Sequence, residues 1–156
     1  MKNLLCTAVL CAFIGGVAGC EVQTPTADRE AVIAVVEAVA AFSQAKNLEG
    51  MDTLFGSEQG VDIIEGAGVN HGWADYRDNH LGPELESFDS IQYRFYSVEP
   101  EVRGNVAWTS FRYDLAIDTE RGHIEREGRG TAVLEKRDGR WLIVHLHTSG
   151  RARRQQ

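Results

Sequence analysis

Residues 126–149 read REGRGTAVLEKRDGRWLIVHLHTS, and this stretch decides the fold. Alternating apolar residues run on both sides of Asp138-Gly139, which is the pattern of two strands joined by a tight turn. Asp-Gly supplies the positive φ angles that a two-residue type I′ turn requires. A turn at these positions sets the pairing of the two strands, and the pairing decides which side chains share a face of the sheet.

The regular register from this turn places both C-terminal histidines on one face. It pairs Ala132 with His145 and Gly130 with His147, so each histidine stands opposite a small residue and has room for a ligand beside it. The other face is predicted to be an apolar stripe that suits a second sheet or subunit, and its pairs are Val133 with Val144 and Thr131 with Leu146.

The rest of the chain places helices before strands. We expect an amphipathic helix over 26–46, a short helix after Asn47, and a third helix over 71–81 that Gly82-Pro83 ends. Further strands are expected over 61–65, 90–98, 106–118 and 123–136. This order predicts an α+β fold in which about three N-terminal helices pack in one curved, mostly antiparallel sheet.

The first twenty residues have the layout of an export signal. Lys2 precedes an apolar run from Leu4 to Ile14, and small residues follow. Residues 17–20, VAGC, resemble the lipobox of bacterial lipoproteins, and the resemblance implies cleavage after Gly19 and acylation of Cys20. A plain signal peptide, cut at a small residue, is the alternative.

The predicted organisation follows from this signal. Residues 1–19 form the lipoprotein signal peptide, 20–26 a lipidated tether, 27–150 the folded domain and 151–156 a basic tail. The protein is then exported and anchored to a membrane of the cell envelope through its lipid, and Glu21 favours the outer membrane.

Composition narrows the function classes. The formal net charge is −7, so the chain lacks the basic field that nucleic-acid binding requires, and no nucleic acid is expected as a partner. All three cysteines lie in the first twenty residues, so we expect neither a disulfide nor a thiolate metal site in the domain. We expect no cofactor.

The element order resembles the cone-shaped fold shared by nuclear transport factor 2 (NTF2), ketosteroid isomerase and the SnoaL-like cyclases. Residues 136–141, KRDGRW, and 144–150, VHLHTSG, resemble the association domain of calcium/calmodulin-dependent kinase II. The resemblance implies a homodimer, or a larger ring, built through the sheet, and a pocket inside the cone. Ala132 stands where that association domain has a pocket arginine, so the same carboxylate-binding pocket is not implied.

The expected ligand pocket combines aromatic and polar residues from several elements, namely Trp73, Tyr76, His80, Trp108, Arg112, Ala132, His145 and His147. Strand 106–118 can turn either of its alternating sets inward, one with Trp108 and Arg112, the other with Phe111 and Tyr113. His145 and His147 have the spacing of a metal pair that His80 would complete, but hydrogen-bonded imidazoles without metal are the favoured interpretation. Asp62 and Glu65 are general-base candidates by analogy with the fold.

Two functions remain open from the sequence. The favoured one is an envelope lipoprotein whose internal pocket binds a small, partly apolar ligand. The alternative is a cyclase or isomerase that uses His80 or His145 as general acid and base. The enzyme hypothesis requires a pocket histidine within hydrogen-bond reach of a carboxylate or a second histidine, with a cavity beside it. No catalytic constellation is matched.

Overall fold

The computed structural model describes residues 25–57 and 60–153. The predicted signal peptide and the lipidation of Cys20 lie outside these residues, as does nearly all of the predicted tether 20–26. Within the described part of the chain, no helix is long and apolar enough to cross a membrane.

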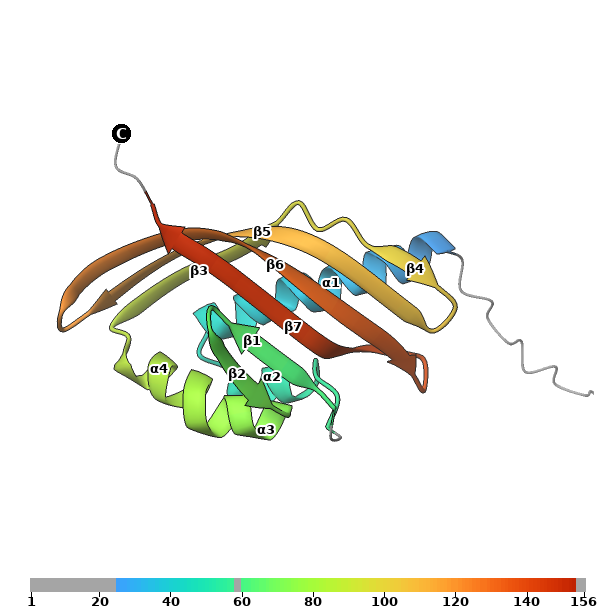
Figure 1. The fold of residues 1–156 in the computed structure, drawn as a ribbon, viewed down its shortest axis with the longest axis horizontal. Helices are drawn as coiled ribbons and strands as arrows, with labels where there is room; N and C mark the ends of the chain where they lie inside the picture. The colour runs from blue at the N-terminus through green and yellow to red at the C-terminus, as the bar shows by residue number, and fades with distance from the viewer. Residues whose placement is uncertain (1–24, 58–59, 154–156) are drawn as a thin grey trace, which may run out of the picture.

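The helical part consists of one long helix and shorter pieces (Figure 1). Its elements are α1 (Pro25–Gln44), α2 (Leu48–Asp52), α3 (Trp73–Tyr76), a π-helical turn (Arg77–Leu81) and α4 (Gly82–Ser87). Valines recur along α1 at three- and four-residue spacing, and Val32, Val36 and Val39 are buried against the sheet. At the start of α2 the Asn47 side chain accepts a hydrogen bond from the Gly50 backbone N–H at 2.8 Å.

The strands form a single curved sheet of seven. They are β1 (Asp62–Glu65), β2 (Gly68–His71), β3 (Ser90–Tyr96), β4 (Glu101–Arg103), β5 (Val106–Thr119), β6 (Gly122–Arg137) and β7 (Arg140–Ala152). The order is β2-β1-β7-β6-β5-β3, with β4 also paired to β5. Only the β1–β7 pair is parallel among these strands. The predicted α+β cone is confirmed.

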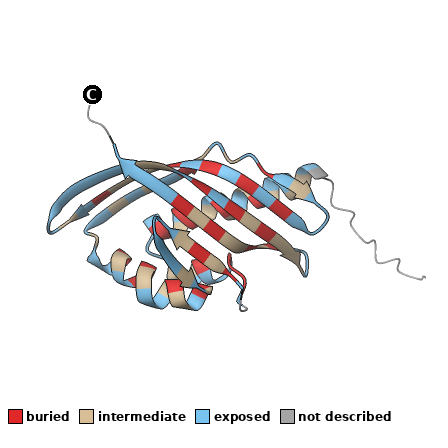
Figure 2. Cartoon of the chain, in the orientation of Figure 1, coloured by how far each residue is buried: buried red, intermediate tan, exposed pale blue. Residues whose placement is uncertain are grey.

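One face of the sheet is covered by the helices and the other is open. Buried and exposed residues alternate along β5 (Figure 2). Phe111 and Tyr113 are buried on the inner face, whereas Trp108 and Arg112 are exposed on the outer face. This settles the orientation of strand 106–118, which the sequence left open.

The predicted register of the last hairpin is wrong beyond its first pairs. Leu134 faces Ile143, as a regular register from the Asp138-Gly139 turn also requires, but Val133 then pairs with His145 and Thr131 with His147. The ladder shifts between Val133 and Leu134, so β7 carries one extra residue there. Both histidines therefore project from the outer face rather than into the cone.

Burial explains why the strand bulges. Trp141, Ile143, Leu146 and Thr148 are all buried, and the step from Ile143 to Leu146 spans three residues. Strict alternation would bury only one of the two residues Ile143 and Leu146, since successive side chains point to opposite faces. A bulge at Val144 lets both Ile143 and Leu146 point inward.

Deletion of Val144 tests this register. The deletion should leave a regular ladder in which Ile143 and Leu146 still face inward, so the protein should remain folded. In the regular register first expected, the same deletion would move every later side chain of β7 to the other face and destroy the core. Cooperative thermal unfolding and a native near-ultraviolet circular dichroism spectrum of the deletion variant would confirm the bulge; loss of both would contradict it.

The helix expected to stop at Gly82-Pro83 continues to Ser87. The widened π turn accounts for this, because the Gly82 N–H bonds to the Arg77 carbonyl and Pro83 enters at the first turn of α4, where its missing N–H costs little. A Cβ on Gly82 would lie 2.7 Å from the Arg77 oxygen, so glycine allows this close turn. The short strands β2 and β4 were not predicted.

Candidate functional site

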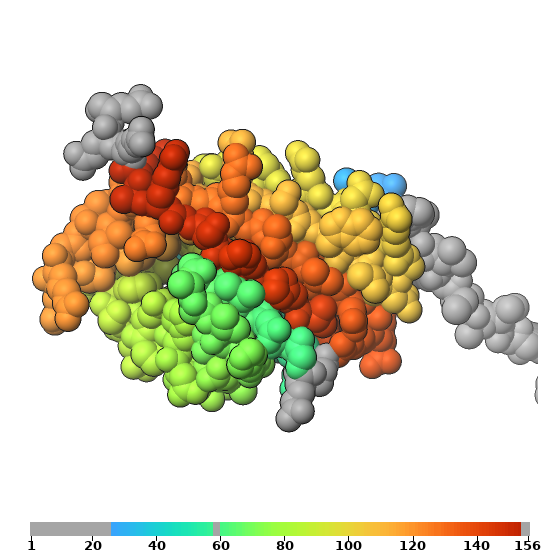
Figure 3. Space-filling view, viewed as in Figure 1, coloured from blue at the N-terminus to red at the C-terminus, as the bar shows by residue number. Residues whose placement is uncertain are grey.

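The cone encloses a cavity of about 50 Å³ between the inner sheet face and the helices. Apolar side chains from α1, α4, β3 and β7 make most of its wall. Its polar lining consists of Ser43, Glu65, Tyr76, Glu84, Tyr93 and Thr148. Glu65 and Glu84 have side chains 41% and 46% exposed, so they mark the open end of the cavity. A recess is visible there, beside the end of β1 (Figure 3).

An imidazole lies between the two carboxylates at this open end. His80 Nε2 is 3.4 Å from Glu84 Oε1 and 3.7 Å from Glu65 Oε2. His80 Nδ1 is 2.9 Å from Asn70 Oδ1, and the Asn70 amide donates to Asp75 at 3.0 Å. Because the Asn70 amide nitrogen donates to Asp75, the Asn70 amide oxygen faces His80 Nδ1. The imidazole therefore presents Nε2 to the two carboxylates.

Hydrogen-bond donors complete the polar end. The Tyr76 hydroxyl donates to Glu65 Oε2 at 2.9 Å. Burial, with the Glu65 carboxylate as the next cause, raises the pKa of Tyr76 and of Tyr93 well above the usual value, so both stay protonated phenols. Burial and then Glu65 also raise the pKa of Glu84, while His80 acts in the opposite direction. The open end of the cavity therefore places phenol donors beside a carboxyl group whose pKa is raised.

A family model for the SnoaL-like domain matches residues 32–152. The chain belongs to the SnoaL-like family. The match covers all of the elements that build the cavity except the first turns of α1. No curated protein sequence matched the chain.

Solved structures with the same fold include an NTF2-like superfamily protein from Salmonella enterica, at TM-score 0.76 and 19% identity over 83% of this chain and 95% of that one. A candidate dehydratase of the NTF2-like family from Streptomyces avermitilis superposes at TM-score 0.73, with 17% identity over 81% and 97%. A candidate calcium/calmodulin-dependent kinase II association domain from Xanthomonas campestris superposes at 0.64, with 17% identity over 86% and 93%. At these identities the likeness establishes the fold alone.

The structure brings two of the eight predicted pocket residues of this SnoaL-like domain to the cavity end. Tyr76 lines the cavity, and His80 contacts the two acids that line it. Trp73 lies beside them but stacks on Phe55 with ring centroids 4.3 Å apart and donates to Asp52 at 2.7 Å. Ala132 is buried on the inner face, away from the cavity lining.

The other four predicted pocket residues, Trp108, Arg112, His145 and His147, lie on the outer face of the sheet. They therefore do not share a cavity with Tyr76 and His80, and His80 cannot join the two C-terminal histidines at one metal ion. Glu65 reaches the cavity, whereas Asp62 contacts His71 at 2.8 Å outside it.

Glu84 and Tyr93 are two of the cavity residues that the sequence analysis did not identify. Glu84 lies four residues after His80, which is one helical turn, but the expected helix end at Gly82-Pro83 hid this spacing. Tyr93 alternates with Ile91 and Phe95 on β3, and all three face the cavity. The alternation was visible in the sequence; the inward face was not.

Proposed function

We propose that this SnoaL-like domain binds a small, partly apolar molecule in the cone, with the polar end of the molecule at Glu65, His80 and Glu84. The observation that carries the proposal is the combination of an apolar chamber with acceptor groups gathered at one end. Pockets of this composition use their few polar groups to orient a ligand.

The charge at the open end selects the ligand's polar group. Two carboxylates favour a hydrogen-bond donor or a cation there and disfavour an anion. The enclosed volume of about 50 Å³ holds only a few atoms, so a larger ligand requires lining side chains, such as Glu84 and Phe88, to move aside.

Calorimetry with three probes that share a phenyl ring and differ in their polar group tests the binding function. Benzylamine and benzyl alcohol should bind, and phenylacetate should bind about tenfold more weakly or worse because its carboxylate meets Glu65 and Glu84. Glu65→Gln should narrow that difference, whereas Asp62→Asn, on the same strand but outside the cavity, should not. Equal affinities for all three probes in the wild-type protein would contradict the proposal.

Acid–base catalysis is a second candidate, favoured by the placement of His80. Its Nδ1 is held by Asn70 and its Nε2 lies beside Glu84, which meets the geometric requirement of the enzyme hypothesis. In such a reaction Nε2 accepts a proton from a carbon next to a substrate carbonyl. The phenol of Tyr76 or Tyr93 stabilises the enolate oxygen by a hydrogen bond, and the imidazolium then returns the proton to another atom of the substrate.

Deuterium exchange separates this candidate from simple binding. The protein should accelerate exchange of solvent deuterium into the carbon next to the carbonyl of cyclohexanone, and His80→Gln should reduce the acceleration by about a hundredfold. His145→Gln, on the outer face, should leave it unchanged. No acceleration over buffer would remove the catalytic candidate and leave the binding function standing.

We also propose a homodimer formed through the outer face of the sheet. Its support is a set of apolar side chains on neighbouring strands, of which Trp108 and Val106 are each 41% exposed and Val133 lies opposite Trp108. Exposed apolar residues grouped in this way are typical of interaction surfaces.

Substitution of Trp108 tests the dimer. The wild-type protein should be dimeric at micromolar concentration, and Trp108→Glu should be monomeric because a charge would be buried at the centre of the interface. Ile124→Glu is the matched control, since Ile124 is also 41% exposed but lies near the turn between β5 and β6. Light scattering that gives the same mass for all three proteins would contradict this interface.

The membrane anchor is a further proposal from the sequence. The VAGC stretch at 17–20 supports lipidation of Cys20 and retention in the cell envelope. Cys20→Ser should abolish palmitate labelling and release the protein from the membrane fraction. Unlabelled wild-type protein that still sediments with membranes would reject the lipid anchor.

A further inference from the structure

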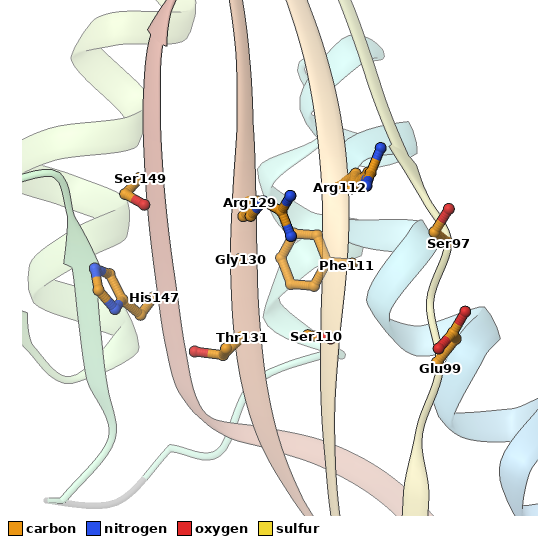
Figure 4. A pocket seen from close by; sticks show the side chains of 10 residues that line it. All are labelled: Ser97, Glu99, Ser110, Phe111, Arg112, Arg129, Gly130, Thr131, His147 and Ser149. Carbon is orange, nitrogen blue, oxygen red and sulfur yellow. The ribbon is translucent and has the colours of Figure 1, made fainter.

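A second hollow, of about 470 Å³, lies on the outer face of the sheet, over β5, β6 and β7 (Figure 4). Cross-strand pairing arranges its side chains in two adjacent rows, one with Arg112, Arg129 and Ser149 and the other with Ser110, Thr131 and His147. All six side chains belong to regular strands, so the backbone of the sheet fixes their spacing.

The first row contains two like charges in direct opposition. Arg112 pairs with Arg129 across β5 and β6, and such a pair destabilises a sheet unless a counter-charge is present. The protein as a whole is acidic, with formal charge −7, yet no ion pair joins either arginine to an acid within the described residues.

Two other acids on this face already form ion pairs with other arginines. Asp114 accepts from Arg94 at 2.8 Å, and Glu127 accepts from Arg151 at 2.7 Å. Glu99 lines the same hollow but forms no ion pair with either arginine of the first row among the described side chains. The fold therefore leaves two guanidinium groups facing one open hollow.

We propose that this outer hollow binds the phosphate group of a small molecule. Guanidinium groups form paired, charge-assisted hydrogen bonds with phosphate oxygens, and two neighbouring arginines match the charge of a phosphate dianion. The hydroxyls of Ser149 and Thr131 line the same hollow and supply further donors, and the imidazole of His147 borders the hollow on β7, turned away from the arginines (Figure 4). The hollow is large enough to hold a small phosphorylated molecule, and it is separate from the cavity inside the cone.

The first test is a calorimetric titration of the full-length protein at constant ionic strength. Inorganic phosphate and phenyl phosphate are the two probes, and both should bind saturably. Arg112→Gln and Arg129→Gln should each weaken binding by about tenfold or more, since each removes a charge-assisted contact. If phenyl phosphate binds more tightly than inorganic phosphate, the site is assigned to an organic phosphate. If the two affinities are equal, the site is assigned to the free phosphate ion.

Two charge controls distinguish a built site from a general charge effect. Arg121→Gln makes the same change of net charge near the turn between β5 and β6 and should leave the affinity unchanged. Glu99→Gln removes the carboxylate at the hollow and should tighten binding. Equal weakening by Arg121→Gln and Arg129→Gln, or no saturable binding, would overturn the proposal.

A second measurement tests the competing occupant. If the arginines instead contact acids of a second copy of the chain, Arg112→Gln with Arg129→Gln would weaken self-association in light scattering without changing phosphate affinity. That outcome would overturn the phosphate site. Unchanged self-association with lost phosphate binding is the expected result.

Discussion

Gly130→Val should destabilise the protein by about 3 kcal/mol, which corresponds to a fall of roughly 10 °C in the unfolding temperature. Gly130 pairs with Phe111 on β5 and with Thr148 on β7. A Cβ at this position would overlap the Phe111 ring, whose Cε1 would be only 2.8 Å away. Phe111 is 2% exposed and stacks on Phe95 with ring centroids 4.3 Å apart, so the ring has nowhere to move.

Thermal unfolding of Gly130→Val and three further variants checks this expectation. Thr131→Val, the next residue along β6 but exposed on the outer face, should change the stability by less than about 0.5 kcal/mol. Gly130→Ala combined with Phe111→Leu should recover part of the stability lost by Gly130→Ala, because the smaller side chain makes room. A Gly130→Val variant as stable as the wild-type protein would show that the ring does not lie over this glycine.

Asp28→Asn should cost about 2 kcal/mol at neutral pH. Asp28 lies in the first turn of α1, and its Oδ1 accepts hydrogen bonds from Lys136 at 2.6 Å and Trp141 at 3.1 Å. The two charged side chains are 14% and 15% exposed, so the pair fastens α1 to the β6–β7 hairpin in a largely dry place. Removal of the carboxylate charge abolishes the ion pair between Asp28 and Lys136 in that place.

The cost of Asp28→Asn should depend on pH with a definite sign. The hydrogen bond from Lys136, helped by Trp141, lowers the pKa of Asp28 below its usual value of 3.8. A carboxyl group whose pKa is lowered by folding stabilises the folded state at pH values above its usual pKa. This stabilisation is lost as the pH falls through the folded-state pKa. Urea unfolding should therefore show a large difference between wild type and variant at pH 7, and a smaller one near pH 3.

The exposed Asp89→Asn variant is the control for this pH dependence and should match the wild-type protein at both pH values. An equal loss for Asp28→Asn at the two pH values would mean that the effect comes from packing rather than from the charge of the carboxylate.

The sequence predicted the architecture because its strongest signals are local. The valine spacing of α1 and the Asp138-Gly139 turn each specify one element from a few adjacent residues. Asp138 and Gly139 have the expected positive φ angles of 50° and 78°. The order of such elements was sufficient to predict the cone.

The sequence failed where the outcome depended on distant packing. Whether β7 alternates or bulges at Val144 is decided by the space inside the cone for Ile143 and Leu146, and no local rule describes that space. Pro83 was misjudged for a similar reason. Its local preference is to follow the end of a helix, but the π turn before it lets the helical segment continue through Pro83. The first error placed two histidines on the wrong face and the second hid Glu84, so together they changed the candidate site more than the fold.

The histidine pair illustrates the consequence for function. A single extra residue at Val144 moves His145 and His147 from the cone to the outer face, where His147 borders the same hollow as Arg129 and Thr131. The polar group at the open end of the cavity instead consists of His80, Glu84 and Glu65, which come from the helical segment and β1. The SnoaL-like domain thus has two separate groups of polar side chains, an acidic one at the open end of the cone and a basic one on the outer face of the sheet.

The most direct test of this account is a nuclear magnetic resonance titration of isotope-labelled protein with benzyl alcohol, which carries no charge to favour either site. If the cone is the ligand site, the largest backbone chemical-shift changes should occur at Glu65, His80, Glu84 and Leu146. Three of these residues line the cavity, and His80 contacts the two acids that line it. Shifts concentrated at Arg129, His145 and His147, with none at the cavity, would contradict the assignment of the ligand site to the interior of the cone.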